Sequence, residues 1–276
     1  MQTILHCLLG ALGVYALVIG LMYVGQRSLM YHPGKPAGTP QQADLAQARE
    51  IRVETADGLS LLSWFVPPDQ GRPVVLYFHG NAGTIAGRAF KASILADNGI
   101  GVLLAEYRAY GGNSGSPTEA GLYADARANL AWLAGQGIKP SNVVIYGESL
   151  GTGVAVQLAL ELAQAGTPAR ALILEAPFTS MTDAGGYHYP WAPISLLIRD
   201  RFESKAKIAD VRSPVMVIHG TADKTVPQAQ GGQLYDLAKE PKRAVWLEGA
   251  GHTDVYDFGA GEAVIEFIDL LMAKDG

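Results

Sequence analysis

The sequence predicts an α/β fold in which helices cover both faces of a mostly parallel sheet. From Pro73 onward, short apolar strand-like runs alternate with helix-like segments, which is typical of strands joined by crossover helices. With 276 residues the chain is long enough to bury one large core, and an α/β domain above 200 residues is ordinary. No internal repeat is visible, so we expect one domain rather than an array.

The first predicted element is an apolar helix from Ile4 to Val24, whose one ionisable side chain is His6. It would span about 31 Å, close to the hydrocarbon thickness of a bilayer. A cleavable signal peptide is the alternative, but no basic side chain precedes the segment and no convincing cleavage site follows it. We predict a retained single-pass membrane anchor in residues 1–25. Arg27 and Lys35 follow it, which weakly favours a cytoplasmic domain and leaves the orientation open.

A linker and a hairpin come next. Residues 26–48 are predicted to be a linker, because Pro33 to Gln47 contains three prolines and two glycines. Glu50–Thr55 and Leu59–Val66 are strand-like runs around Ala56-Asp57-Gly58, which indicates a hairpin. The globular domain is therefore predicted to occupy residues 49–276.

The alternating region contains six predicted strands and five predicted helices. The strands are Val74–Phe78, Gly101–Glu106, Val143–Tyr146, Ala171–Glu175, Val215–Ile218 and Ala244–Leu247. The helices are Gly87–Asn98, Thr118–Gly135, Thr152–Ala165, Gln228–Lys239 and Ala260–Ala273. One helix start has a marked signal: Ser116 as the capping residue, Pro117 at the first helical position and Glu119 to complete a capping box.

Composition excludes several classes of function. The net charge is −5, and neither a Lys/Arg cluster nor a stripe of stacking aromatic residues indicates a nucleic-acid partner. The single cysteine, Cys7, lies in the predicted anchor, so no disulfide can hold the domain together. Zinc-type Cys/His spacing, a phosphate-binding loop and a dinucleotide fingerprint are all absent from the sequence, so no metal or organic cofactor is implied.

Ser149 is the predicted nucleophile. It lies between the strand-like run that ends at Tyr146 and the helix-like run that begins at Thr152. A serine on such a turn is held in a strained, exposed position, and Gly147 and Gly151 leave room for the sharp bend. The alternative is an ordinary structural turn. The nucleophile needs a base and an orienting acid later in the chain.

Asp223 and His252 are the predicted acid and base. Each follows a predicted strand, and reacting groups gather at the carboxyl ends of the strands in such sheets. The order Ser149, Asp223, His252 is that of a Ser-Asp-His catalytic triad on this type of fold. Glu175 and Asp183 remain as rivals for the role of the acid.

The chemistry explains these residue types. Free serine is a poor nucleophile, so His252 would accept its proton during attack and Asp223 would hold the imidazole in the required tautomer. The oxyanion needs backbone donors, and we expect the N–H groups of Leu150 and Asn81, with Ala82 as the near alternative to Asn81. His79 and His219 are predicted to brace the loops that carry these groups, without a chemical role.

Several motifs together resemble the α/β-hydrolase superfamily. They are His79-Gly80-Asn81-Ala82-Gly83, Glu106-Tyr107-Arg108-Ala109-Tyr110-Gly111, Gly147-Glu148-Ser149-Leu150-Gly151, His219-Gly220-Thr221-Ala222-Asp223-Lys224-Thr225-Val226-Pro227 and Gly251-His252. More narrowly, the chain resembles the membrane-anchored branch that includes bacterial hydrolases and protein depalmitoylases, from about Arg27 to the C-terminus. One departure is Ala105-Glu106 before Tyr107-Arg108, where an Asp is more usual. The resemblance implies a serine hydrolase acting on esters or thioesters, and leaves lipids, acylated proteins, small esters and peptides open as substrates.

Residues 178–210 exceed the length of a plain crossover. In the resembled fold such an insertion forms a cap over the nucleophile, so Tyr187, Trp191, Leu196 and Leu197 are candidates for an acyl pocket. The alternative is that they only pack the cap onto the sheet. Two other functions stay open: a serine peptidase or aminopeptidase of the same fold, and a membrane-tethered interaction module without catalysis. The expected partners are a small-molecule or acylated-protein ester and, through the N-terminal helix, a membrane; the oligomeric state is unknown.

Overall fold

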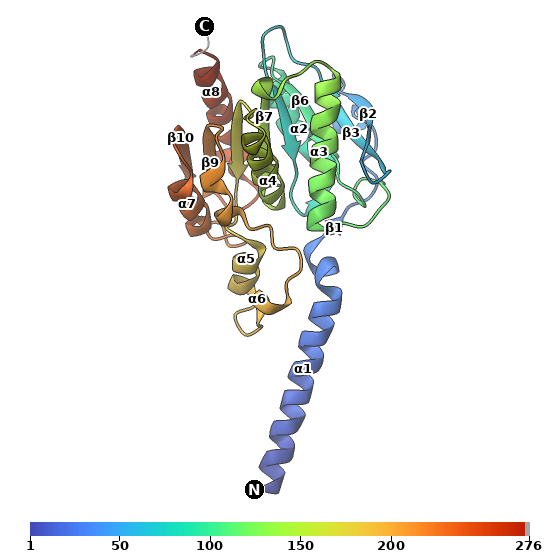
Figure 1. The fold of residues 1–276 in the computed structure, drawn as a ribbon, viewed down its shortest axis with the longest axis vertical. Coiled ribbons are helices and arrows are strands. Elements are labelled where there is room, and N and C mark those ends of the chain that lie inside the picture. Colours follow the sequence, from blue (N-terminus) through green and yellow to red (C-terminus); the bar gives the residue numbers. More distant parts are fainter. Residues whose placement is uncertain (274–276) are drawn as a thin grey trace.

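A computed structural model describes residues 1–273, so the last three residues of the predicted 49–276 domain lie outside it. The domain is built on an eight-stranded sheet with the order β10-β9-β8-β7-β4-β6-β3-β2 (Figure 1). The strands of this sheet are β2 (Arg49–Glu54), β3 (Ser60–Val66), β4 (Val74–Phe78), β6 (Gly101–Ala105), β7 (Val143–Glu148), β8 (Ala171–Glu175), β9 (Val215–Gly220) and β10 (Lys242–Leu247). The helices are α1 (Gln2–Met30), α2 (Ala89–Ala96), α3 (Glu119–Gly135), α4 (Leu150–Gln164), α5 (Met181–His188), α6 (Ile194–Leu197), α7 (Gln228–Leu237) and α8 (Ala260–Met272).

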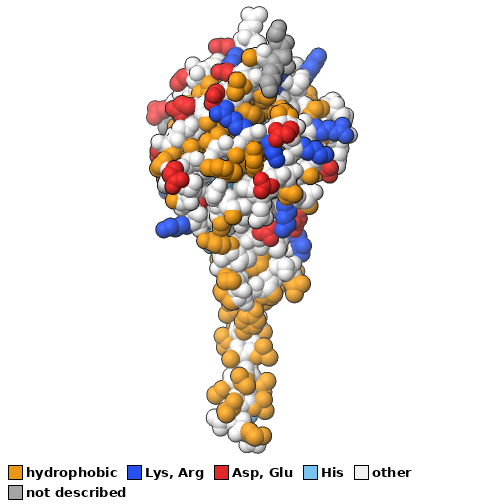
Figure 2. All heavy atoms as spheres, turned by 90° about the vertical axis from the view of Figure 1, so that its left-hand side faces the viewer, with side chains coloured by type: hydrophobic (Ala, Val, Ile, Leu, Met, Phe, Trp, Pro, Cys, Tyr) orange, Lys and Arg blue, Asp and Glu red, His pale blue; other side chains and the backbone are white. Residues whose placement is uncertain are grey.

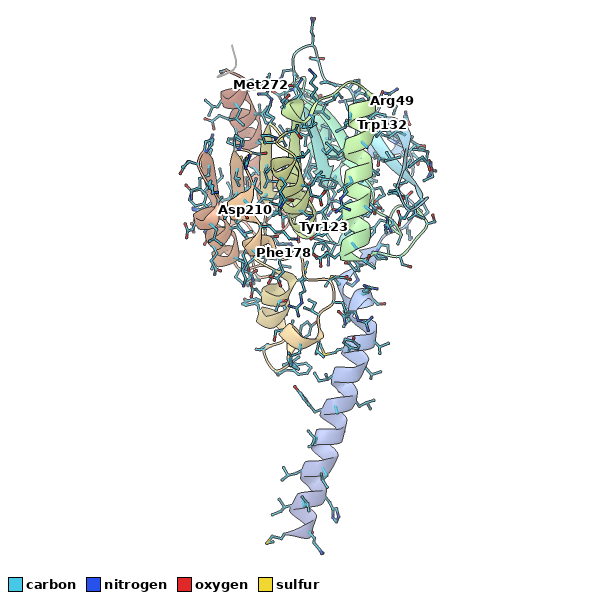
Figure 3. The ribbon with its side chains drawn as sticks, viewed as in Figure 1. Arg49, Tyr123, Trp132, Phe178, Asp210 and Met272 are labelled. Carbon is cyan, nitrogen blue, oxygen red and sulfur yellow. The ribbon has the colours of Figure 1, made fainter. Side chains whose placement is uncertain are left out.

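The sheet confirms the predicted α/β fold. β2 and β3 form the expected antiparallel hairpin, β3 also runs antiparallel to β6, and the strands from β6 to β10 across the sheet are parallel. One core cluster packs α3, α4 and α7 on one face, and a second packs α2 and α8 on the other. The central strands β4, β6 and β8 are buried along their whole length because helices cover both faces of the sheet (Figure 3).

The first helix, α1, projects from the domain (Figure 1). An 18-residue window of it has a mean hydropathy of 2.3, and none of that window is buried within the described residues, so length and composition suit a membrane span. α1 continues through Met30, five residues beyond the predicted anchor. The predicted linker is also packed: Tyr31, Leu45 and Ala48 are buried, and a short strand β1 (His32–Pro33) pairs with β5 (Ala82–Gly83).

The capping prediction for α3 is wrong. The cap is Thr118, whose side chain accepts a hydrogen bond from the N–H of Gly121 at 2.9 Å, and the helix begins at Glu119. Thr118 has an extended backbone with φ −149°, so the preceding Pro117 cannot lie inside the helix. Ser116 consequently lies too far back to reach the free N–H groups of the first turn.

The cap consists of α5 and α6 with the loops around them. It lies beyond the carboxyl ends of the parallel strands, next to the C-terminal half of α1 (Figure 1). In the part of the chain that the structure describes, α5 buries only Ala184, and α6 buries no residue fully. The cap is therefore held more loosely than the sheet.

Candidate active site

Ser149 occupies the turn between β7 and α4 in a strained backbone conformation, with φ 50° and ψ −114°. Few residues other than glycine adopt a positive φ. A Cβ on Gly147 would collide with the backbone of Gly151 and Thr152, and one on Gly151 would collide with the carbonyl oxygen of Phe78. Both glycines are therefore required for the helix to pack against the strand so closely, and the turn presents the Ser149 side chain beyond the sheet edge.

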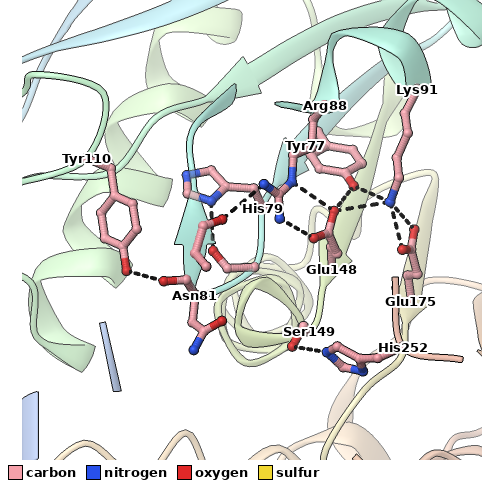
Figure 4. A network of polar contacts seen from close by, with 12 residues as sticks. Tyr77, His79, Asn81, Arg88, Lys91, Tyr110, Glu148, Ser149, Glu175 and His252 are labelled. Atoms are coloured by element: carbon pink, nitrogen blue, oxygen red, sulfur yellow. Dashed lines mark hydrogen bonds and ion pairs between the residues drawn. The ribbon is translucent and has the colours of Figure 1, made fainter. Parts of the chain in front are cut away.

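The structure brings Ser149, His252 and Asp223 together although they come from three separate loops. His252 Nε2 lies 2.9 Å from the Oγ of Ser149 (Figure 4), and His252 Nδ1 lies 2.7 Å from Oδ2 of Asp223. The β10–β9–β8–β7 order places their strand ends along one edge of the sheet. When Nδ1 donates to Asp223, Nε2 is free to accept the hydroxyl proton of Ser149.

Asp223 is held as a carboxylate. Burial opposes its ionisation, but hydrogen bonds from His219 and His252 outweigh that cost and hold the pKa of Asp223 well below its usual value. The N–H groups of Thr225 and Val226 donate to Oδ1 at 2.8 and 2.9 Å. His219 thus has a contact that the sequence analysis did not predict, since its Nε2 lies 3.1 Å from Asp223.

The two rival acids have other partners. Glu175 is fully buried and accepts hydrogen bonds from Lys91, at 2.7 and 3.0 Å, and from the hydroxyl of Tyr146. Asp183 lies at the start of the cap and accepts hydrogen bonds from Thr179 and Lys205. Among the described residues, Asp223 is the carboxylate that contacts His252.

The predicted oxyanion donors belong to residues that line the same cavity as Ser149. Leu150 opens α4, where the first N–H groups have no partner within the helix. Asn81 lies on the loop after β4, and its carbonyl oxygen accepts hydrogen bonds from the N–H of His32 and the hydroxyl of Tyr110. These bonds fix the loop beside Ser149.

His79 and Glu106 brace the Asn81 loop from within. His79 is fully buried, with Nε2 2.7 Å from Oε1 of Glu106 and Nδ1 2.8 Å from the carbonyl oxygen of Gly80. The other oxygen of Glu106 accepts from the N–H of Ile85 at 3.0 Å. Glu106, the residue at the departure from the resembled pattern, therefore ties both ends of this loop to β6.

A buried ionic cluster lies directly behind Ser149 (Figure 4). The Arg88 guanidinium and the Lys91 ammonium both contact Glu148, the residue before Ser149, and Lys91 also contacts Glu175. Tyr77 donates to Glu148 as well. The sequence analysis missed this cluster, because single charged residues scattered over two helices and two strands form no motif.

A cavity of about 390 Å³ opens above Ser149. Of the four residues predicted for an acyl pocket, Leu197 lines it, but Tyr187, Trp191 and Leu196 do not. Their side chains are 54%, 51% and 82% exposed. The lining instead comes from other apolar residues of the cap and its base, including Phe178, Met181, Ile194 and Ile198.

Sequence comparisons place this chain among hydrolases. The family model described as alpha/beta hydrolase fold matches residues 75–217. The chain is 43% identical over 240 residues to the protein Rv2307c of Mycobacterium tuberculosis, covering 86% of this chain and 84% of that one. It is 31% identical to lysophosphatidylserine lipase ABHD12 of Danio rerio, over 74% of this chain and 62% of the relative. It is 36% identical to human alpha/beta hydrolase domain-containing protein 17B, over 67% and 62%.

Solved structures show the same fold. The Pyrococcus furiosus esterase Pf2001 has a TM-score of 0.69 and 20% identity, with 87% of this chain and 99% of the esterase covered. An alpha-beta hydrolase from Vibrio vulnificus has a TM-score of 0.67 and 23% identity, with 83% and 82% covered. At these identities the likeness concerns the fold.

Proposed function

The chain belongs to the α/β-hydrolase family, and on this premise we propose that it is a serine hydrolase that cleaves carboxylic ester or thioester bonds through an acyl-serine intermediate. One observation carries the proposal: the continuous hydrogen-bonded chain from Ser149 through His252 to the Asp223 carboxylate. The strained turn at Ser149 and the cavity above it support the proposal further.

The reaction begins when the Oγ of Ser149 attacks the carbonyl carbon and its proton passes to Nε2 of His252. The Asp223 carboxylate stabilises the imidazolium that forms. The backbone N–H groups of Leu150 and Asn81 stabilise the oxyanion, and each such donor contributes about 3 kcal/mol to the transition state.

The tetrahedral intermediate then collapses and expels the alcohol or thiol, which takes the proton from His252. Water attacks the resulting acyl-serine, with His252 again accepting and returning the proton. The products are a carboxylic acid and the free Ser149 hydroxyl. Because His252 can also protonate an amine, a peptidase of the same fold shares this sequence of steps.

The test is fluorophosphonate labelling together with hydrolysis of matched butyrate esters, thioesters and anilides. Ser149→Ala is expected to abolish labelling and to lower kcat by about 10⁶, as loss of the nucleophile does in a serine hydrolase. Ser141→Ala, which changes an exposed serine in the short 3-10 helix before β7, serves as the control and should leave both unchanged. Undiminished labelling of folded Ser149→Ala protein contradicts the assignment. An unlabelled native protein favours the non-catalytic module, and preferred cleavage of the anilide favours a peptidase.

We also propose that α1 is retained as a single-pass anchor, because it is apolar on every face and projects from the domain. The full-length protein should then remain with membranes after alkaline carbonate extraction. A soluble, N-terminally shortened species would instead identify the segment as a signal peptide.

A further inference from the structure

The last turns of α1 form one wall of the cavity above Ser149. Met22, Gln26, Leu29 and Met30 of this helix line the cavity, opposite the cap residues, with Ser149 among the remaining lining residues. Met22 lies within the apolar run from residue 4 to residue 24 that suits a membrane span. A residue of the proposed anchor therefore also belongs to the proposed substrate site.

Polar bonds join α1 to the cap. Gln26 Oε1 accepts a hydrogen bond from the N–H of Arg199 at 2.8 Å, and Gln26 Nε2 donates to the carbonyl oxygen of Leu197 at 3.2 Å. In the last turn of α1, Arg27 forms an ion pair with the buried Asp200, with Nε 2.9 Å from Oδ2. The two Gln26 bonds satisfy backbone groups of the cap, and the Arg27–Asp200 pair adds a charged contact, so polar bonds join α1 to the cap.

The contact continues toward the N-terminus. The hydroxyl of Tyr15 donates to the carbonyl oxygen of Trp191 at 3.1 Å, and the two rings meet edge to face with centroids 6.4 Å apart. Tyr15, Met22 and Gln26 follow the three-and-four-residue spacing that places side chains on one face of a helix. One face of α1 therefore meets the cap, and the other faces are free to meet lipid.

The same helix is connected to the proposed oxyanion loop. Asn81 Nδ2 donates to the carbonyl oxygen of Met30 at 3.1 Å, and the N–H of His32, two residues further on, donates to the carbonyl oxygen of Asn81 at 2.9 Å. Asn81, the last turns of α1 and Ser149 therefore line one cavity.

The outer side of the cap suits the surface of a bilayer. Tyr187, Trp191 and Leu196 are exposed on the cap, Trp191 contacts Tyr15 of α1, and the guanidinium carbon of the exposed Arg199 lies 4.3 Å from the centroid of the Tyr23 ring. Aromatic and arginine side chains are enriched where hydrocarbon meets headgroups. Figure 2 shows apolar side chains along α1 and up to the base of the domain, with most charged side chains above them.

We propose that α1 is part of the acyl-binding site, so that the acyl chain of a membrane-resident ester or thioester passes from the bilayer between α1 and the cap, with its carbonyl group at Ser149. This inference rests on the proposed serine-hydrolase function. The cavity volume lies near the lower end of about 300–1,000 Å³ for ligand pockets, which suits one acyl chain better than two. A chain that follows this path moves between two apolar environments and never crosses water, which removes most of the cost of extracting a lipid.

The test uses full-length protein in phosphatidylcholine vesicles and compares p-nitrophenyl palmitate with p-nitrophenyl butyrate. Met22→Trp fills the cavity from the α1 side, and the ratio of kcat/KM for palmitate to that for butyrate is expected to fall about tenfold or more. Leu21→Trp adds the same bulk one residue away, on an exposed side of the helix, and should leave both rates at the native values.

Fluorophosphonate labelling separates the two levels of the proposal. If native protein is not labelled, the serine-hydrolase function fails. If it is labelled but Met22→Trp and Leu21→Trp give the native palmitate-to-butyrate ratio, α1 is no part of the site. Met22→Ala guards against misfolding of the larger variant: it enlarges the cavity, and its ratio should shift as well. An unchanged ratio in a labelled, folded Met22→Ala protein also overturns the proposal.

Discussion

Ser149 separates two regions of opposite character. Behind it, toward the sheet, lies the ionic cluster of Arg88, Lys91, Glu148 and Glu175, whose side chains are 1–17% exposed. In front of it lies the apolar cavity between the cap and α1, and the cap also carries Tyr187, Trp191 and Leu196, which are half exposed or more and do not line the cavity. The two cations and two carboxylates behind Ser149 balance each other, whereas the short helices of the cap bury little and are joined to α1 by polar bonds.

This difference indicates that the two regions have different roles. Removing one member of a buried ion pair leaves an uncompensated charge and costs about 3–5 kcal/mol, so the cluster tolerates little change. Helices of eight and four residues depend on packing for their stability, so the cap can adjust at small cost. We expect changes behind Ser149 to alter the rate for every substrate, and changes in front of it to alter which substrate is preferred.

The largest expected effect is that of Asp223→Asn, which tests whether the acid of the proposed triad follows β9 or belongs to the cap. Asp223→Asn preserves shape but removes the charge that orients His252, and in a serine protease the equivalent change lowers turnover by about 10⁴. We expect a loss of similar order in kcat. Asp183→Asn, which changes the carboxylate at the cap entrance, is the matched control and should cost about tenfold or less.

Both variants are compared at equal distance below their melting temperatures, so that misfolding is not read as lost chemistry. Near-normal turnover of Asp223→Asn with a crippled Asp183→Asn would assign the acid to the cap. Glu175→Gln is a further comparison, and it is expected to lower stability more than turnover because it leaves Lys91 without one of its carboxylates.

The next effect concerns Arg88 as a positioning residue. It holds the Glu148 carboxylate and also donates to the carbonyl oxygen of Ala82 at 3.0 Å, so it links the Ser149 turn to the Asn81 loop. Arg88→Met should lower kcat about tenfold to a hundredfold with KM nearly constant, equally for butyrate and palmitate. Arg88→Lys should restore only part of the rate, because it keeps the charge but loses the two-pronged geometry.

The matched control is Arg127→Met, which removes a similar paired guanidinium from the partly exposed pair with Glu161. It should leave kcat unchanged. A fall in KM or a shift in chain-length preference for Arg88→Met would place Arg88 with the substrate-selecting region and break the comparison.

The cluster also predicts a pH dependence of stability. Burial opposes ionisation of Glu148, but the charges of Lys91 and Arg88 outweigh it and hold its pKa below the usual 4.5. A carboxyl with a lowered pKa contributes stability that is present above pH 4.5 and is lost as the pH falls toward the folded-state pKa. The free energy of unfolding should therefore decrease below pH 4.5, by at most about 1.4 kcal/mol per pH unit for this one group.

Lys91 contributes on the alkaline side. Burial lowers its pKa, but Glu175 and Glu148 outweigh that effect and raise it above 10.5, so its contribution to stability is present below that pH and is lost at higher pH.

The acid-side prediction is tested with Glu148→Gln. Urea unfolding of this variant between pH 3 and 7 should give a lower free energy of unfolding that depends less on pH than that of the native protein. A variant curve parallel to the native one in the acid range would show that Glu148 is not the group that titrates.

The fold was predictable because its signals are repeated. Each central strand is an apolar run flanked by turns, and the strand-end rule drew attention to Asp223 and His252 without any knowledge of the sheet order. The signal at Ser149 was equally local, since two glycines and a strand-to-helix change lie within five residues. These features are determined by residues close together in the sequence, so they can be predicted from it.

The rest depends on contacts between distant residues. Lys91 meets Glu148 and Glu175 across 57 and 84 positions, and no pattern in either neighbourhood announces the contact. The prediction of the pocket-lining residues in the cap was largely wrong for a different reason. Its helices are too short to show a periodicity, so apolar residues on the outer side, such as Leu196, could not be distinguished from lining residues such as Leu197. The contribution of α1 to the cavity could not be predicted, because a helix that is apolar on every face gives no indication of which face packs against the domain.

The smallest effect tests the outer side of the cap. If the cap rests in the bilayer surface, the exposed Trp191 side chain lies among lipid headgroups and upper acyl chains, and brominated lipids should quench part of the tryptophan fluorescence. Trp191→Phe should remove most of that quenching and raise KM for vesicle-borne palmitate about twofold, because one aromatic side chain adds little to an anchor as apolar as α1. Trp246→Phe is the matched control, since Trp246 is 38% exposed on β10, away from the cap, and should leave the amount of fluorescence that the lipids quench unchanged. Equal loss of quenching in the two variants would mean that the whole domain, rather than the cap, touches lipid. Unchanged quenching in Trp191→Phe would mean that the cap stands clear of the membrane, and the apolar region in front of Ser149 would then have to receive its substrate from water.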